Sequence, residues 1–325
     1  MKVELVSGSR RSRAMALGAR GGSWVLVTAL LVSCASLPER AAAPRATYPP
    51  MNGLEAMIAS GDPPRDAPPL QACGDAQDGF DGWLESFRRY AVSQQISPRT
   101  VSNALSGLTY DGEVIALDRS QKAFKLSSEE FIAKRVTRGL VARGTALIRI
   151  HAPLLARIEA RFGVAPEILV ALWGLETDFG QSTGSRPCLR ALATLAYDCR
   201  RGARFQGELL SALRILERGD LAPDEMVGAW AGELGQTQFL PSSYERFAVD
   251  FDGDGRADLV GSSADALAST ASYLQGHGWR PHEGFLPGSP NFAALGEWNA
   301  SDVYRSAIVF FASKLGSSSP PTAGR

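Results

Sequence analysis

One carboxylate stands out in this sequence because it ends an otherwise apolar segment. Glu176 follows the run ALWGL and precedes TDFG. Pro166 can start a helix here, and the neighbouring Leu, Trp and Phe side chains would shield a carboxylate at the end of that helix. Burial raises the pKa of a carboxylate toward the range of a general acid. A Glu at a helix C-terminus is also commonly a solvated surface group, so residue types alone leave both interpretations open.

A second group of carboxylates has the spacing of a calcium-binding loop within residues 250–265. The run DFDGDGR puts carboxylates at loop positions 1, 3 and 5, a Gly at position 6 and a backbone carbonyl at position 7. The candidate ligands in this run are Asp250, Asp252, Asp254 and Arg256. Position 12, a bidentate Glu in a standard EF-hand, is Gly261. The sequence therefore predicts a structural Ca²⁺ site with an atypical second half, and a solvated turn is the alternative.

The sequence lacks the residue patterns of several other kinds of catalytic or cofactor-binding site. The three His residues, His151, His277 and His282, include no pair at the i,i+4 spacing of a helical zinc site. The sequence also has no GxSxG elbow, no P-loop and no dinucleotide fingerprint. His277, in the segment GHGW, is expected to cap a helix C-terminus, where the helix dipole favours a cation.

The charge distribution divides the 325-residue chain into unequal parts. Its 34 Lys and Arg residues balance 34 Asp and Glu, but five of the basic residues and one acidic residue lie within residues 1–33. The remaining 29 basic and 33 acidic residues make everything after residue 33 mildly acidic. Nucleic-acid binding requires a clustered basic surface, so we expect no nucleic-acid partner.

Residues 1–33 have the layout of a signal peptide. A basic segment precedes the apolar run at 24–32, and small residues follow it. This run is too short for a membrane span, which takes about 20 residues. The sequence LVSC, ending at Cys34, resembles the bacterial lipobox and implies a lipid anchor on that cysteine. Ala35 after it implies the outer membrane. A cleaved signal without lipidation is the alternative, and Met15 is a second possible start.

Residues 34–72 are expected to form a tether. The segment is rich in Pro and Ala and shows little periodicity, so it buries too little apolar surface to offset the entropy lost on folding. Its prolines favour an extended chain of about 3 Å per residue. Such a tether would hold a folded domain away from a membrane.

The elements that must position the carboxylates are helices, and residues 73–320 are expected to form one mainly α-helical domain. Apolar residues recur at helical spacing from Phe80, and Ser97-Pro98 supplies an N-cap followed by proline at the first helical position. One long helix is predicted from about residue 127 through Leu147. Further helices are expected over 153–162, 166–176, 203–218, 263–276 and 301–315. No segment alternates with the period of a strand, so little or no β structure is expected.

Five segments resemble the lytic murein transglycosylase B family, in the order that the family has them. ALWGLETDFG, which contains Glu176, looks like the catalytic helix with its ETxxG motif. The others are ALATLAYDCRR at 191–201, GAWAGELGQTQFLPSSYERFAVDFDGDGRADL at 228–259, ASTASYLQGHGW at 268–279 and WNASDVY at 298–304. The resemblance implies a lysozyme-like helical fold and an enzyme that cleaves peptidoglycan glycan strands.

The resemblance also implies a role for each matching residue. Glu176 would be the single catalytic acid and base. The substrate-binding residues would be Arg200, Arg201, Gln238, Phe239, Tyr273, Trp298, Asn299 and Tyr304. The two amides would orient N-acetyl and hydroxyl groups, the Arg pair would attract acidic peptide stems, and aromatic faces would contact sugar rings or, alternatively, pack in the core. The family's metal loop closes with a late Asp, which matches Asp265.

The reaction implied by the resemblance needs only one carboxylate. The acid would protonate the glycosidic oxygen between MurNAc and GlcNAc, then take the proton from the MurNAc C6 hydroxyl as a 1,6-anhydro ring closes.

Two departures from the family's sequence pattern keep alternative functions open. Glu233, where the family commonly has Ala, could assist water in a muramidase reaction. Ala229, where many members have Ser, allows a non-catalytic peptidoglycan-binding lipoprotein.

Three cysteines remain after Cys34, an odd number for an oxidising compartment. Cys73 lies before the first predicted helix and Cys199 lies beside the Arg pair, so a bond between these two is favoured. A short-range bond between Cys188 and Cys199 is the alternative. We expect a periplasmic, lipid-anchored monomer.

Overall fold

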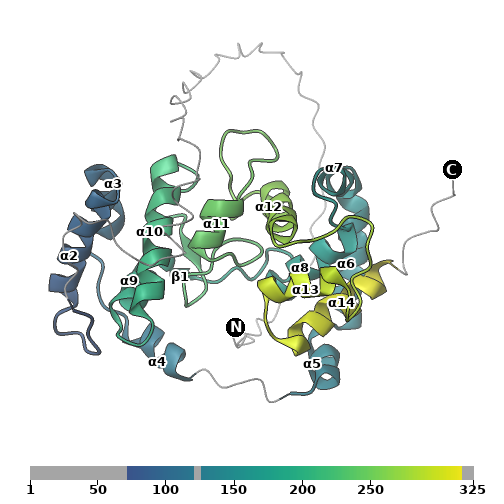
Figure 1. Ribbon diagram of the computed structural model, residues 1–325, viewed down its shortest axis with the longest axis horizontal. Helices are drawn as coiled ribbons and strands as arrows, with labels where there is room; N and C mark the ends of the chain where they lie inside the picture. The colour runs from purple at the N-terminus through teal and green to yellow at the C-terminus, as the bar shows by residue number, and fades with distance from the viewer. Residues whose placement is uncertain (1–71, 121–125, 317–325) are drawn as a thin grey trace, which may run out of the picture. The chain divides into compact units, whose positions relative to one another are not determined.

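The computed structural model describes residues 72–120 and 126–316 (Figure 1). The predicted signal peptide, Cys34 and nearly all of the predicted tether lie outside these residues. The helices are α2 (Phe80–Ser93), α3 (Pro98–Leu105), α4 (Gly112–Ser120), α5 (Ser128–Arg135), α6 (Arg138–Ile150), α7 (Ala152–Phe162), α8 (Pro166–Thr177), α9 (Cys188–Tyr197), α10 (Gly202–Arg218), α11 (Pro241–Phe247), α12 (Ser263–Gly276), α13 (Pro290–Trp298) and α14 (Asp302–Gly316).

The predicted mainly α-helical class is confirmed. Within the described ranges there are two strands of two residues each, β1 (Arg186–Pro187) and β2 (Val227–Gly228), besides isolated β-bridges. They pair antiparallel, with Arg186 opposite Gly228. No helix in the described part of the chain combines the length and the apolar character that a membrane span requires.

The helix starts follow the capping signals in the sequence. The Ser97 side chain accepts a hydrogen bond from the Thr100 amide at 3.2 Å, and Pro98 occupies the first position of α3. This arrangement satisfies one of the amides that a helix start leaves unpaired. The predicted apolar face of α2 is buried as expected.

The single long helix predicted from residue 127 through Leu147 is wrong. Ser127 does start a helix, and forms a capping box with Glu130, but α5 ends at Arg135. Thr137 then accepts a hydrogen bond from the Leu140 amide at 3.1 Å and starts α6. The threonine cap allows the chain to turn between two short helices, whereas the apolar spacing continues through both.

The buried side chains form two clusters. The first lies around α2, α3, α4, α9 and α10, and the second around α5 to α8 and α12 to α14. Helices α9 and α10 pack against each other, as do α14 and α8 (Figure 1). Two partly buried aromatic residues, Tyr273 and Trp298, pack against both clusters. They therefore mark a place where the two clusters approach each other.

Helix α8 runs through the second cluster and is buried along almost its whole length. It packs against α6, α7, α12 and α14. A helix that is apolar on all sides needs neighbours on all sides, which explains its lack of a polar face. Gly174 permits this packing, because a Cβ there would lie 2.8 Å from the rings of Phe179 and Phe311. The last turn of this enclosed helix carries Glu176.

Candidate active site

The Glu176 carboxylate is partly buried and receives two hydrogen bonds on one oxygen. Trp298 Nε1 donates to Glu176 Oε1 at 3.2 Å, and the Tyr304 hydroxyl donates to the same oxygen. Trp298 ends α13 and Tyr304 lies in the first turn of α14, so three helices meet at this carboxylate. The structure thus brings together three of the predicted site residues.

Tyr304 stays protonated over the whole physiological range. Its side chain is buried, and burial raises its pKa well above the usual value, with further increases from the Glu176 charge and their hydrogen bond. Nearby Arg135 acts in the opposite direction, and its guanidinium also donates to the Leu175 carbonyl at 2.9 Å. The phenol is therefore a permanent donor to the carboxylate.

Thr177 connects the end of α8 to the segment that carries Gln238. Its buried hydroxyl donates to the Gln236 carbonyl and accepts from the Gly180 amide at 2.9 Å. Asp178 and Phe179, which follow it, both have left-handed backbone conformations, with φ of 52° and 61°. Such conformations persist where surrounding contacts fix them.

Gln238 is fixed by its backbone and by its side chain. Its φ of 58° is also left-handed, and its Nε2 donates to the carbonyls of Thr183 and Gly235, both at 3.0 Å. Because both amide hydrogens face backbone carbonyls, Oε1 is the atom that this side chain can offer to a hydroxyl or N–H group of a substrate.

Phe239, Tyr273 and Trp298 form an aromatic cluster beside the carboxylate. The Phe239 and Trp298 rings have centroids 5.4 Å apart and lie nearly perpendicular, as do Tyr273 and Trp298 at 5.2 Å. Phe239 is only 3% exposed, so it packs against the two partly exposed rings and does not face solvent itself. These edge-to-face pairs restrict the position of the Trp298 indole.

Tyr273, near the end of α12, forms hydrogen bonds through its hydroxyl and through its backbone carbonyl. Its hydroxyl donates to the Glu297 carbonyl at 2.7 Å, and burial, followed by the nearby Glu297 charge, raises its pKa to about 12. Its own carbonyl pairs with Nδ1 of His277 at 2.7 Å. His277 is the C-cap of α12, which confirms the predicted helix-end position.

Asn299 follows Trp298, and its side chain binds the backbone just before the next helix. Its Oδ1 accepts from the Ser301 amide at 2.9 Å, which leads the chain into α14. The amide Nδ2 is then the group that this side chain can offer to a carbonyl oxygen, such as that of an N-acetyl group.

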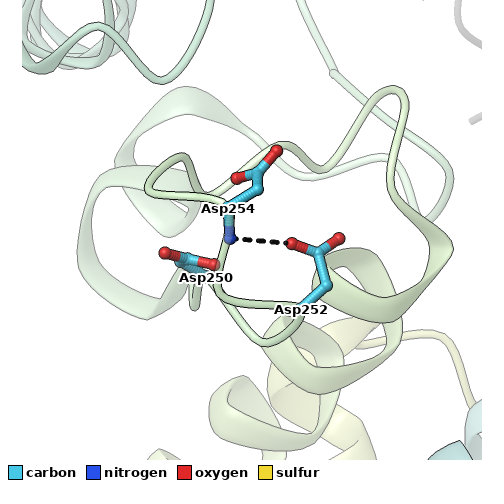
Figure 2. A group of neighbouring side chains, drawn as sticks. All are labelled: Asp250, Asp252 and Asp254. Carbon is cyan, nitrogen blue, oxygen red and sulfur yellow. Dashed lines mark hydrogen bonds between the residues drawn. The ribbon is translucent and has the colours of Figure 1, made fainter. Parts of the chain in front are cut away.

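The structure brings the first three loop carboxylates together. Asp250, Asp252 and Asp254 each offer an oxygen within 4.8 Å of the others (Figure 2). Gly253 and Gly255 take φ of 84° and 95°, the left-handed values that allow the loop to turn this sharply. Oxygen-rich groups of this kind suit hard cations such as Ca²⁺.

Asp265, the late Asp predicted to close the metal loop, has other hydrogen-bond partners in the structure. Asp265 is fully buried and lies outside the acidic group; its Oδ1 accepts from the amides of Phe251 (2.7 Å) and Asp252 (3.3 Å), and its Oδ2 from Asp258 (2.9 Å). It therefore ties both arms of the loop to α12. The Arg256 guanidinium donates to the Asp220 carbonyl and pairs with Glu225 at 2.8 Å, and the atom predicted to be a ligand at loop position 7 is the Arg256 backbone carbonyl.

The acidic loop supports the Gln238 segment through backbone contacts. The Gln236 amide donates to the Leu259 carbonyl at 2.9 Å, and its side-chain Nε2 donates to the Val260 carbonyl at 3.2 Å. Through Thr177, the same residue is bonded to α8. A continuous set of hydrogen bonds thus runs from the loop to the helix that carries Glu176.

Comparison with known proteins agrees with this arrangement. The pattern of the family described as "Transglycosylase SLT domain" matches residues 79–287. The chain belongs to this family. Residues 79–287 contain Glu176, the aromatic residues Phe239 and Tyr273, and the acidic loop, whereas Trp298 and Tyr304 lie beyond the matched range.

Members of the transglycosylase family are similar to this chain in sequence and structure. Membrane-bound lytic murein transglycosylase B of Escherichia coli is 37% identical over 166 residues, 49% of this chain; the chain spans a little under half of that relative's length, 46%. SltB3 of Pseudomonas aeruginosa, crystallised with NAG-anhNAM-pentapeptide, is 31% identical with a TM-score of 0.70 over 74% of this chain and 80% of its own. Escherichia coli SLT35, crystallised with calcium, is 25% identical with a TM-score of 0.65 over 76% and 96%.

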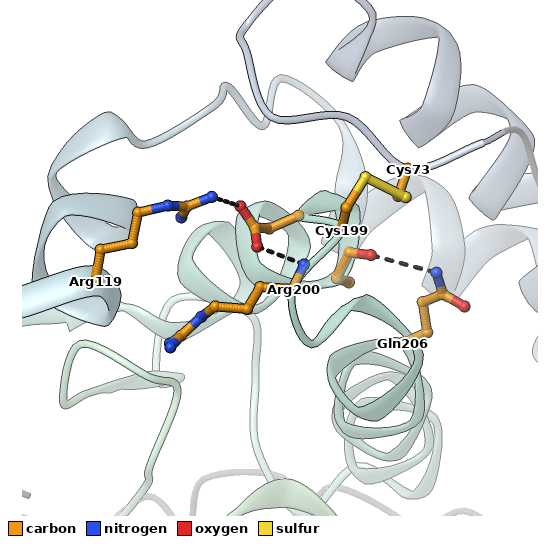
Figure 3. The surroundings of a disulfide bond; sticks show 7 residues. Cys73, Arg119, Cys199, Arg200 and Gln206 are labelled. Atoms are coloured by element: carbon orange, nitrogen blue, oxygen red, sulfur yellow. Dashed lines mark hydrogen bonds and ion pairs between the residues drawn. A yellow bond between two sulfur atoms is a disulfide. The ribbon is translucent and has the colours of Figure 1, made fainter. Parts of the chain in front are cut away.

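The Arg pair that the family resemblance singled out lies beside a disulfide bond. Cys73 and Cys199 are bonded, the pairing that the sequence analysis favoured (Figure 3). Cys188 is free and buried. Both guanidiniums, of Arg200 and Arg201, form ion pairs with Asp118, which is only 1% exposed.

A second ion pair continues this network. Arg119 pairs with the buried Asp198 at 2.7 Å, and Asp198 also accepts from the Arg200 amide at 2.9 Å (Figure 3). Three guanidiniums face two carboxylates, which leaves an excess positive charge. Arg200 and Arg201 are 45% and 30% exposed, so this charge is accessible to an anion.

Of the two departures from the family pattern, Glu233 has a defined local contact, and nothing in the structure explains Ala229. The Glu233 side chain accepts from the Ala231 amide at 3.2 Å, and its backbone carbonyl accepts from the Ala229 amide at 2.9 Å. The Glu233 charge raises the pKa of the buried Cys188 thiol, after the larger effect of burial. The Glu233 carboxylate therefore stabilises the backbone turn at residues 229–233.

Sequence reasoning missed residues that organise the site. Thr177 and Gln236 were present in the matching segments but had no assigned role. The available signal was the hydroxyl of Thr177 directly after Glu176 at the helix end, where a Thr side chain can bond to nearby backbone groups. Asp118, which forms ion pairs with Arg200 and Arg201, had no such signal in the sequence. It lies about 80 residues before these partners and contacts them only in the folded chain.

Proposed function

We propose that this protein is a lytic transglycosylase that cleaves the β-1,4 bond between MurNAc and GlcNAc in peptidoglycan, leaving 1,6-anhydroMurNAc ends. The observation that carries the proposal is the family's ETxxG glutamate, Glu176, held by Trp298 and Tyr304 at the end of a buried helix. A partly desolvated carboxyl with permanent donors is suited to give up a proton and to take one back.

The reaction needs Glu176 first as an acid and then as a base. The protonated carboxyl gives its proton to the glycosidic oxygen while the bond from that oxygen to MurNAc C1 breaks. The resulting carboxylate removes the proton of the C6 hydroxyl, and the C6 oxygen bonds to C1. Because the proton returns to Glu176 and no water is consumed, one carboxylate is sufficient.

The other predicted residues bind and orient the glycan in this proposal. Gln238 Oε1 and Asn299 Nδ2 meet the hydroxyl and N-acetyl groups of the sugars. Trp298 and Tyr273 present partly exposed rings to sugar faces, supported by Phe239. The excess charge of the Arg200 and Arg201 cluster attracts carboxylates of the peptide stems.

The direct test of this function is Glu176→Gln, which keeps the size of the side chain and removes its acidity. Wild-type protein should solubilise purified sacculi, and the variant should release at least 1,000-fold less, a loss on the scale of a key acid/base group. Equal thermal stability of the two proteins would show that the fold is intact. If the variant is as active as the wild type, Glu176 is not the acid.

Binding without catalysis is the alternative from a different functional class. A scaffolding protein would pellet with sacculi and release no soluble fragments. The Glu176→Gln variant would then bind and behave as the wild type does. Measuring binding and release on the same samples separates these outcomes.

We also propose that Ca²⁺ binds the acidic loop and stabilises it. The three carboxylates of Asp250, Asp252 and Asp254 and the Arg256 carbonyl are oxygen donors at the first half of an EF-hand pattern. Bringing three negative charges this close without a cation is unfavourable. The loop is bonded to Gln236, so an ion here would stiffen the segment that carries Gln238.

The calcium proposal predicts a stability difference. Adding Ca²⁺ to chelator-treated protein should raise its Tm, since an ion that binds only the folded state stabilises it by mass action. Asp252→Asn should weaken this response, and Asp224→Asn, at an exposed acid outside the loop, should leave it unchanged. An equal response in both variants would contradict a site at the loop.

Finally, we propose that the protein is lipid-anchored in the periplasm through Cys34, at the outer membrane. The export-signal layout of residues 1–33 and the LVSC sequence support this. Labelled fatty acid should be incorporated by the full chain and not by Cys34→Ser. Equal incorporation in both would contradict the anchor.

A further inference from the structure

A partly buried guanidinium lies at the end of α8, next to the residue that carries the proposed acid. Arg135, the last residue of α5, donates from Nη2 to the Leu175 carbonyl at 2.9 Å, one residue before Glu176. We infer that Arg135 is a positioning residue whose positive charge balances the Glu176 carboxylate that forms when the acid gives up its proton. The inference rests on the proposed function and adds a residue outside the five segments that resemble the family.

Two observations place the Arg135 charge in the surroundings of the Glu176 carboxylate. The Leu175 carbonyl that Arg135 contacts belongs to the last turn of α8, which also carries Glu176. Burial raises the pKa of Tyr304 and the Arg135 charge acts in the opposite direction, so the guanidinium is close enough to affect this phenol. The Tyr304 hydroxyl in turn donates to Glu176. The guanidinium is therefore linked to the acid through the backbone of α8 and through a side chain of α14.

The end of α8 is an unfavourable place for a new negative charge. The last four carbonyls of a helix have no intrahelical partner, and the helix dipole has its negative end there. Leu175 carries one of these carbonyls, and Glu176 carries the next one. By bonding to the Leu175 carbonyl, Arg135 satisfies an acceptor at the helix end and brings a positive charge to it.

The Arg135 charge is not balanced by another acid in the described part of the chain. No Asp or Glu side chain there forms an ion pair with it. Two arginines on neighbouring helices differ in this respect, because Arg143 on α6 pairs with Asp178, and Arg305 on α14 pairs with Asp302. The Arg135 charge thus remains available to a carboxylate that forms at the end of α8.

Other charged and titratable groups lie on the helices that pack against α8. Tyr273 on α12 donates to the Glu297 carbonyl at 2.7 Å. On α7, the guanidiniums of Arg157 and Arg161 lie over the Phe251 ring, 4.8 and 5.8 Å from its centre. All of these groups, with the two ion pairs of α6 and α14, are kept in the variants below. A change in pH dependence can therefore be assigned to the removal of the Arg135 charge.

The charge affects both steps of the proposed reaction. As the carboxyl gives its proton to the glycosidic oxygen, negative charge develops on Glu176, and a cation that is already in place stabilises it without reorganisation. The same cation makes the carboxylate a weaker base when it takes the proton of the C6 hydroxyl. Removing the charge should therefore change both the rate and the pH range of the reaction.

A double-mutant cycle between Arg135 and Glu176 tests the inference without turnover. Arg135→Gln removes the positive charge and keeps a hydrogen-bond donor, and Glu176→Gln removes the carboxylate. If the two charges attract each other, Arg135→Gln should lower Tm by about 3 °C less in the Glu176→Gln background than in the wild type at pH 7. Tm values of the four proteins, measured at the same pH and salt concentration, give this difference.

Arg190→Gln is the matched control for the cycle. Arg190 lies on α9, and its guanidinium also donates to backbone carbonyls, those of Thr109 and Tyr110, at 3.1 and 3.2 Å. Helix α9 belongs to the first buried cluster, whereas α8 belongs to the second. Arg190→Gln should therefore lower Tm equally in the two backgrounds. If Arg135→Gln also lowers Tm equally in both, the inference is overturned.

The pH dependence of turnover separates a role of the charge from a role of the hydrogen bond. Arg135→Gln should reduce kcat about tenfold and move the alkaline limb of the pH profile up by about one pH unit, because removing a nearby cation raises the pKa of a carboxyl. Arg135→Lys keeps the charge and should leave the limb in place. A residue that only bonds the Leu175 carbonyl would affect stability in both variants and move the limb in neither.

The outcomes for Arg135 and for the proposed function are distinguishable. Absence of anhydro products from the wild type would refute the proposed function, while the Tm cycle needs only folded protein. Additive Tm effects in an enzyme that forms anhydro products would refute only the role of Arg135. If Arg135→Gln does not fold, Arg135→Lys decides the outcome, and a shifted alkaline limb in that variant would overturn the inference.

Discussion

Replacing Thr177 by Val should loosen the connection between Glu176 and the Gln238 segment. The Thr177 hydroxyl is buried and joins the Gln236 carbonyl to the Gly180 amide. Valine has nearly the same shape but cannot form either bond. The substitution therefore removes the hydrogen bonds with little change in packing.

The expected loss follows from the two groups left without Thr177. An unpaired buried backbone group costs about 1–3 kcal/mol, so two of them should reduce the free energy of unfolding by roughly 3 kcal/mol. For a domain of this size, that corresponds to a fall in Tm of roughly 6–12 °C. The freed segment should also misplace Gln238, and a small displacement in an active site can reduce kcat about 100-fold.

Thr194→Val is the matched control for this prediction. Thr194 is fully buried on α9, accepts from the Asp111 amide at 3.1 Å and donates to the Arg190 carbonyl at 2.9 Å. Denaturant unfolding and sacculus turnover should be measured for both variants. Thr194→Val should lose stability while keeping kcat within about threefold of wild type at temperatures where it is folded. Equal kcat losses in the two variants would refute the reasoning.

Two further predictions concern the frame of the site. The Cys73–Cys199 bond spans a sequence separation of 126 residues, so replacing both cysteines by Ser should lower the free energy of unfolding by about 5 kcal/mol on the chain-entropy model. A loss below about 1 kcal/mol in guanidinium unfolding would contradict this. Tyr273, with a pKa raised to about 12, keeps its proton in the folded state after the unfolded chain has lost it. Stability should fall as pH rises from about 10 to 12, and Tyr273→Phe should flatten that slope of Tm against pH; an equally steep slope would contradict it.

Helix positions were predictable where capping and apolar spacing agree. Ser97 and Pro98 mark α3, and Pro166 marks α8, as the structure has them. The break at Thr137 was missed because the apolar spacing is continuous across it. Helices α9 and α13 were not predicted. Nearly every residue of α9 is buried, and α13 begins at Ser289-Pro290, a cap signal of the same kind as Ser97-Pro98 that was overlooked.

The site was predictable only where its residues lie in matching motifs. Glu176 and the acidic loop carry their own sequence signals. The donors to Glu176 lie more than 120 residues later in the chain, so their convergence on Oε1 depends on the packing of α13 and α14 against α8. The pairing of Arg200 and Arg201 with Asp118 is likewise a product of folding.

The most direct test of the proposed reaction is a sacculus digest in water enriched in heavy oxygen, with the released muropeptides weighed by mass spectrometry. Closure of the C6 oxygen onto C1 uses no water, so the products should be 1,6-anhydro muropeptides without heavy oxygen. A muramidase would release reducing sugars that are heavier by one water and carry the label. Labelled reducing ends as the main product would contradict the single-carboxylate mechanism at Glu176.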